Sequence, residues 1–168
     1  MFLLILLVFF MLFYMVWRTS FVVVQPYEQG VLIVNGRFKR ILNPGINIVP
    51  PFISQAAKID LREKELSVGP VNVITKDGQK ARFDGTMVIQ VRDPKKAYLE
   101  VTDHKRAAVS LMETVLKAVL QDMEFEKILW ERTKLYDHLM HVMNEALETW
   151  GTRLNRFEFT DINKTGHV

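Results

Sequence analysis

The chain has 168 residues, enough for a domain with a buried core, and no cysteine, which excludes disulfides, thiolate metal sites and a cysteine nucleophile. Its 22 basic and 19 acidic residues leave a formal net charge of only +3. The basic residues do not alternate with exposed aromatic residues as in nucleic-acid sites, so the charge favours anionic lipid as a partner and no nucleic acid.

The first 17 residues, Met1–Trp17, form an uninterrupted apolar run, because no charged residue precedes Arg18. A helix of this length is about 25 Å long, and the next few residues can extend it toward the roughly 30 Å hydrocarbon core of a bilayer. Trp17 and Arg18 stand at its end, where an aromatic ring and a long cationic side chain favour the membrane interface. A cleaved signal peptide would need a basic start and a small-residue cleavage site, and neither is present. The sequence therefore predicts a single-pass transmembrane anchor over residues 1–20.

The basic residues closest to this anchor all follow it in the chain: Arg18, Arg37, Lys39 and Arg40. Basic residues next to a membrane segment tend to stay on the cytoplasmic side. We therefore expect the chain in a membrane, the plasma or inner membrane if it is bacterial, with the rest of the chain in the cytoplasm.

The residues after the anchor follow a β pattern. Phe21–Val24 and Gly30–Val34 are rich in β-branched residues and are separated by a turn. Asn35-Gly36 predicts a hairpin, and Lys76-Asp77-Gly78 predicts a second turn. The clearest strand is Lys80–Arg92, because apolar and polar residues alternate along it. Its apolar face carries Ala81, Phe83, Gly85, Met87, Ile89 and Val91.

The second half of the chain turns helical at Asp93-Pro94, an N-cap residue followed by proline. A longer helix is predicted from Asp103 to Gln121, with an apolar stripe at helical spacing. Another is predicted from Glu131 to Thr149, ended by Gly151, with Leu135, Leu139, Val142, Ala146 and Trp150 on its apolar face. A final strand carries Phe157 and Phe159 inward. These elements predict an α+β fold rather than repeated βαβ units.

No set of residues typical of catalysis is found in the sequence. The serines lie outside any G-x-S-x-G motif, and the glycines do not form a phosphate-binding loop. His138, His141 and Glu145 have a spacing compatible with a metal on one helix face. The apolar stripe occupies other positions, so these residues should face solvent without enclosing ligands. We therefore expect no enzyme activity, no cofactor and no metal.

Residues 43–53 are apolar, yet Pro44, Pro50 and Pro51 exclude a helix or an inner strand. An irregular apolar segment needs an apolar environment, either the core or the membrane beside the anchor. The basic cluster just before it favours the membrane, where it would meet lipid phosphates. The expected membrane-contact residues are Arg37, Lys39, Arg40, Pro44, Gly45, Ile46, Ile48, Pro51, Phe52 and Ile53.

Several short motifs occur in a characteristic order: Tyr27, Glu28 and Gly30, then Gly36-Arg37, Pro44-Gly45, Pro51-Phe52, Asp60-Leu61-Arg62, residues 73–78, Asp93-Pro94 and Trp150-Gly151. This order resembles the SPFH or band-seven superfamily of stomatin, prohibitin and flotillin, over about residues 15–163. The bacterial stomatin-like branch looks most similar.

The resemblance implies a two-lobed SPFH domain at residues 21–163, with a strand-rich lobe at 21–78 and a strand-helix-helix-strand lobe at 79–163. Mixed or antiparallel strands would have helices packed on one side, and residues 164–168 would form a tail. It implies a non-enzymatic membrane scaffold that oligomerises laterally and organises membrane microdomains. It also implies that such a scaffold modulates membrane proteins such as an AAA-type protease or a channel.

The chain departs from the family pattern after Asp161-Ile162. Family members continue there into a long charged helix that forms a coiled coil, and no heptad run is present here. The departure implies a minimal family member or one that co-assembles with a longer SPFH partner. An alternative function stays open: a regulatory binding subunit of a membrane protease or transporter that forms no large assembly.

Overall fold

The computed structural model describes residues 1–164, apart from the side chains of residues 2, 3, 12, 13 and 15–19. The expected interface residues Trp17 and Arg18 and most of the expected tail, residues 165–168, therefore lie outside the described part. The chain divides into two compact units, Met1–Leu61 and Arg62–Val168.

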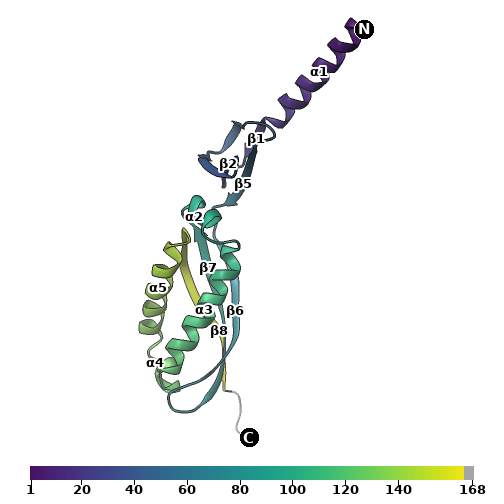
Figure 1. Ribbon diagram of the computed structural model, residues 1–168. Helices are drawn as coiled ribbons and strands as arrows, with labels where there is room; N and C mark the ends of the chain where they lie inside the picture. The colour runs from purple at the N-terminus through teal and green to yellow at the C-terminus, as the bar shows by residue number, and fades with distance from the viewer. Residues whose placement is uncertain (165–168) are drawn as a thin grey trace. The chain divides into compact units, whose positions relative to one another are not determined.

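The first unit consists of one helix and five short strands: α1 (Phe2–Thr19), β1 (Phe21–Val24), β2 (Glu28–Val34), β3 (Arg37–Leu42), β4 (Gly45–Ile48) and β5 (Ser54–Asp60) (Figure 1). Strands β1 and β4 form a two-stranded antiparallel ribbon, and β3, β2 and β5 form a three-stranded antiparallel sheet in that order. The core of this unit is small and consists of Val24, Leu32, Leu42 and Val49. Among the residues that the structure describes, no helix combines the length and the apolarity that crossing a membrane requires.

The strands expected at Phe21–Val24 and Gly30–Val34 are confirmed as β1 and β2, and Asn35-Gly36 joins β2 to β3. The expectation that residues 43–53 are irregular throughout is wrong. Four of them form β4, because the prolines flank this stretch and do not interrupt it. A short strand that pairs on one side only can tolerate proline next to its ends.

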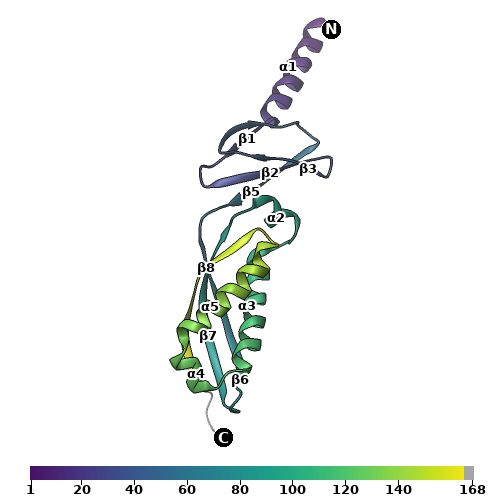
Figure 2. The ribbon, with the colours of Figure 1, turned by 90° about the vertical axis from the view of Figure 1, so that its left-hand side faces the viewer.

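The second unit consists of three long strands and four helices: β6 (Lys64–Ile74), β7 (Lys80–Val91), α2 (Pro94–Leu99), α3 (His104–Gln121), α4 (Phe125–Trp130), α5 (Arg132–Glu148) and β8 (Thr152–Lys164). The strands form one antiparallel sheet in the order β6-β7-β8. Helix α3 contacts β6 and α5 contacts β8, so that both helices cover one face of the sheet (Figure 2). The alternation predicted for residues 80–92 is confirmed, because Phe83, Met87 and Ile89 are buried in the core under these helices.

The predicted N-cap at Asp93 is confirmed, and Asp103 caps the next helix in the same way. Oδ1 of Asp93 accepts hydrogen bonds from the backbone N–H groups of Lys95 and Lys96 at 3.0 and 3.2 Å. Oδ1 of Asp103 accepts from Lys105 and Arg106 at 3.2 and 3.1 Å, and the latter contact lowers the pKa of the Asp103 carboxyl. These acceptors satisfy N–H groups that a helix start leaves without partners, which sets where α2 and α3 begin.

Two details of the second unit differ from the sequence predictions. The buried face of α5 is Leu135, Leu139, Met143 and Leu147, whereas Val142 and Ala146 are only half-buried. The division between the units lies after Leu61 and not after residue 78, because β6 pairs with β7 over most of its length. The turn predicted at Lys76-Asp77-Gly78 is therefore the hairpin inside the second unit.

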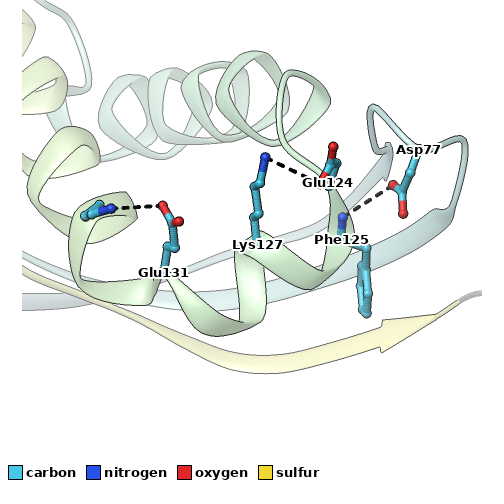
Figure 3. Close-up of polar contacts among 6 residues, drawn as sticks. Asp77, Glu124, Phe125, Lys127 and Glu131 are labelled. Atoms are coloured by element: carbon cyan, nitrogen blue, oxygen red, sulfur yellow. Dashed lines mark hydrogen bonds and ion pairs between the residues drawn. The ribbon is translucent and has the colours of Figure 1, made fainter.

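Helix α4 was not predicted, and a contact from the β6–β7 turn holds its start (Figure 3). The carboxylate of Asp77 accepts a hydrogen bond from the backbone N–H of Phe125 at 3.3 Å and another from the Thr75 hydroxyl. The Thr75 hydrogen bond lowers the pKa of Asp77. A contact between residues 48 positions apart thus fixes the start of a helix of only six residues. Local sequence patterns alone would not specify so short a helix.

Candidate membrane-contact surface

The β1–β4 ribbon has an exposed apolar face. Phe21 pairs with Ile48 and Val23 pairs with Ile46, so the four side chains lie on the same face of the ribbon. They are 37, 67, 52 and 74% exposed, respectively. Val24, on the opposite face, is buried in the small core of the unit. Both faces of the ribbon therefore carry apolar side chains, and those of one face are exposed to a large part.

The segment that follows β4 adds Phe52 and Ile53 to the exposed apolar residues. Phe52 is 77% exposed and has a φ of 66°, a left-handed conformation that is rare for a bulky residue. Backbone hydrogen bonds hold this turn, from the N–H of Ile53 to the carbonyl of Pro51 at 2.8 Å and from the N–H of Asn35 to the carbonyl of Ile53 at 3.0 Å. Strain of this kind is typical of functional surfaces, where the surrounding structure keeps a side chain in an unfavourable position.

One of the three basic residues of β3 reaches this apolar surface. Arg37, Lys39 and Arg40 are exposed, and Nη2 of Arg40 donates a hydrogen bond to the carbonyl of Ile48 at 3.4 Å. Within residues 1–164 no salt bridge is found for any of the three. Their charges are therefore available to an anionic partner.

The charge of the whole chain is concentrated in this unit. Residues 1–61 contain five basic and two acidic residues, whereas residues 62–168 contain seventeen of each. The first unit therefore carries the entire formal excess of +3. Uneven charge of this kind attracts an anionic surface to one part of a molecule.

The structure brings most of the expected contact residues together within the first unit. Ile46 and Ile48 lie on β4, Arg40 reaches Ile48, and the exposed Pro44 and Gly45 lie at the start of the same strand. Pro51 is only half-buried beside Phe52. The sequence also left open that residues 43–53 pack in the core. Of the side chains in this segment, only that of Val49 is buried there.

Two further residues of the surface, Phe21 and Val23, were missed as contact residues because Phe21–Val24 was interpreted only as a strand. Their signal in the sequence was the run of four apolar residues Phe21–Val24. A strand with alternating side chains and no polar residue must place apolar groups on both faces.

The residues considered for metal binding give no site. His138, His141 and Glu145 are all exposed on α5. In the described part of the chain no group of three or more His, Cys, Asp or Glu residues could hold a metal ion.

Comparison with known proteins agrees with the family resemblance that the motifs indicate. The family model of the SPFH domain / Band 7 family matches residues 22–165. An uncharacterized protein of Methanocaldococcus jannaschii is 33% identical over 144 residues, which cover 86% of this chain and 72% of that protein. An uncharacterized protein of Methanothermobacter thermautotrophicus is 34% identical over 149 residues, 89% of this chain and 47% of that protein.

A eukaryotic relative carries a name. The human protein called stomatin-like protein 2, mitochondrial, is 30% identical over 148 residues, which cover 87% of this chain and 42% of that protein. The chain thus spans less than half the length of two of these three relatives. The expected place in the bacterial stomatin-like branch stays a prediction. The match over most of the chain, together with the antiparallel α+β architecture, shows that the chain belongs to the SPFH domain / Band 7 family.

Proposed function

We propose that this chain is a non-enzymatic, membrane-anchored scaffold of the stomatin type, which assembles laterally and organises the membrane around it. The observation that carries the proposal is the exposed apolar face of the β1–β4 ribbon, which the basic residue Arg40 of β3 contacts. Large apolar patches rimmed by polar residues mark surfaces that contact a membrane or another protein.

The proposed anchor is α1, which leads into β1 after a single residue, Ser20. It has 18 residues and is therefore about 27 Å long. Its described apolar side chains, from Leu4 through Met11, are all exposed around the helix. A helix that is apolar all round needs an apolar environment, which a bilayer would supply. The basic residues that follow would keep the remainder of the chain on the cytoplasmic side.

The membrane-contact surface would then rest in the lipid headgroup region beside this anchor. Burying a large apolar side chain contributes about 1.5–3 kcal/mol, and each basic residue near an anionic surface contributes about 1 kcal/mol. Ile46, Ile48 and Phe52 together with Arg37, Lys39 and Arg40 would therefore hold the unit against the membrane by several kcal/mol. Such contact would orient the domain in addition to tethering it.

The name of the human relative and the family membership support a role like that of stomatin. In this role the partners would be membrane lipids, further copies of the chain or a longer SPFH protein, and client membrane proteins such as an AAA-type protease or a channel. No catalytic step is required of any residue in this proposal.

The contact surface can be tested in the full chain, because the protein has no native cysteine. Ile48→Cys and Ile74→Cys each place one spin label on an exposed strand residue, 67 and 56% exposed, respectively. In lipid discs we expect the label at position 48 to be accessible to oxygen and protected from a water-soluble nickel complex, and the label at 74 to show the opposite. Equal access of the nickel complex to both labels would refute the contact surface.

Lateral assembly has a separate test. Extraction of the full chain in native lipid discs, followed by electron microscopy, should show large ring-like or clustered particles. Small particles that carry a second membrane protein would instead favour the regulatory-subunit function and would identify its partner.

A further inference from the structure

A cavity of about 440 Å³ lies within the second unit, at the end of the sheet where β7 leads into α2 and β8 begins. The C-terminal part of α5 forms another wall. Three basic residues from three different elements line it: Arg92 after β7, Lys96 on α2 and Arg153 on β8. Cavities of a few hundred Å³ are typical of sites for small molecules.

The walls of this cavity are held by hydrogen bonds that do not depend on a ligand. The carbonyl of Gly151 accepts from the backbone N–H groups of Arg92 and Asp93 at 2.8 and 2.9 Å. The side-chain amide of Asn144 accepts from the N–H of Leu154 at 2.8 Å and donates to its carbonyl at 3.2 Å. These contacts join the β7–α2 corner and α5 to the first residues of β8, so the cavity exists before anything binds.

The charges around the cavity do not neutralise one another. Of the two acidic residues that line it, Asp93 already accepts the N–H groups at the start of α2. Glu148 is the other. Across residues 1–164 no salt bridge is found for Arg92, Arg153 or Glu148, and the same holds for Lys96. The cavity therefore offers uncompensated positive charge together with one free carboxylate.

We propose that this cavity binds a phosphate ester whose other end carries an ammonium or hydroxyl group. Arg92, Lys96 and Arg153 would hold the phosphate, since guanidinium and ammonium groups form charge-assisted hydrogen bonds to its oxygens. The Glu148 carboxylate would accept from the ammonium or hydroxyl end. The volume exceeds what a bare phosphate ion needs, which favours an ester over the inorganic ion. Such an ester can come from a phospholipid headgroup or from a soluble metabolite.

The first test is a calorimetric titration of the full chain in maltoside micelles with phosphoethanolamine. We expect saturable binding that Arg153→Gln weakens at least about tenfold, which corresponds to about 1.4 kcal/mol. Arg132→Gln is the matched control, because Arg132 is exposed at the start of α5 and does not line the cavity. It removes the same charge from the same unit and should change the affinity less than about twofold. Lys96→Gln provides a second cavity variant if Arg153→Gln fails to fold.

The carboxylate makes a separate prediction about selectivity. Glu148→Gln should remove the preference for phosphoethanolamine over inorganic phosphate, because the ammonium end loses its acceptor. An unchanged preference would overturn the assignment of Glu148.

The source of the ester is distinguished by repeating the measurement with discs of phosphatidylethanolamine and of phosphatidylcholine. Binding of the soluble ester supports a metabolite. Absence of that binding, with a preference for phosphatidylethanolamine that Arg153→Gln abolishes, supports a lipid headgroup. Equal weakening by the cavity and control variants, or no binding to any of these probes, would overturn the proposal.

Discussion

Replacement of Gly151 by alanine is a small chemical change that should strongly destabilise the second unit. It ends α5 with a φ of +62°, a conformation that L-residues rarely adopt. A Cβ at this position would overlap with the carbonyl oxygen of Asp93 and would lie 2.8 Å from Cβ of Lys96. Both neighbours belong to the capped start of α2, so neither can move without disturbing that helix.

The size of the effect follows from two contributions. A left-handed conformation costs a residue with a Cβ about 1–2 kcal/mol. The clash with Asp93 adds to this, because relieving it lengthens the two hydrogen bonds that the Gly151 carbonyl accepts, each contributing about 0.5–1.5 kcal/mol. Gly151→Ala should therefore lower the free energy of unfolding by about 2–5 kcal/mol.

Gly78 provides a matched control in the same unit. Its φ is +78°, but a Cβ there would meet no atom within 4 Å. Gly78→Ala should therefore cost only the conformational contribution, about 1–2 kcal/mol. Urea unfolding of the full chain in micelles, followed by circular dichroism, measures both variants. Equal losses for the two would refute the argument that close approach to α2 requires glycine at 151.

Leu116→Ala should lower the free energy of unfolding by about 2–5 kcal/mol, because Leu116 is 1% exposed between α3 and the sheet; a loss below about 0.5 kcal/mol in the same assay would contradict this packing. Burial lowers the pKa of His104 below its ordinary value of 6.5, so the folded state binds fewer protons and stability should fall as the pH drops below 6.5. Unfolding measured against pH should show a flatter curve for His104→Gln than for the original protein, and identical curves would contradict the assignment. Asp77→Ala should speed hydrogen exchange at the Phe125 amide, which loses its acceptor, and unchanged exchange would exclude Asp77 as the residue that holds the start of α4.

Most of the fold could be predicted from local patterns, because local chemistry sets those elements. Aspartate N-caps begin α2 and α3, and alternation of apolar and polar residues marks most of β7, with Val88 as an exception. The exceptions depend on contacts distant in the sequence. Helix α4 begins where Asp77 reaches it from a turn 48 residues away. The sequence of α4 itself contains no signal that predicts this contact.

The buried face of α5 shows a second limit of sequence patterns. Two apolar stripes share this helix, and both contain Leu135 and Leu139. The core selects Met143 and Leu147, whereas Val142 and Ala146 flank it. A helix with apolar residues on more than one face can be oriented only once its neighbours are known.

The candidate contact surface was predictable in composition but not in shape. The apolar residues and prolines of residues 43–53 indicated a segment that needs an apolar environment. The pairing of this segment with β1 was not foreseen, and it is this pairing that places Phe21 and Val23 beside Ile46 and Ile48. Cross-strand pairing depends on register, which short apolar segments specify weakly.

The two kinds of residue on this surface should respond differently to salt. If the proposed contact forms, attraction of Arg37, Lys39 and Arg40 to anionic lipid would be screened within about 8 Å at physiological ionic strength, whereas burial of Ile46 and Phe52 would not depend on charge. The basic residues therefore suit the first approach and orientation of the unit, and the apolar residues suit its retention. Since residues 62–168 carry no net charge, an anionic membrane would attract the first unit without attracting the second to a comparable degree. Under the proposed function, the distribution of charge along the chain would thus favour one defined contact with the membrane over adsorption through the whole domain.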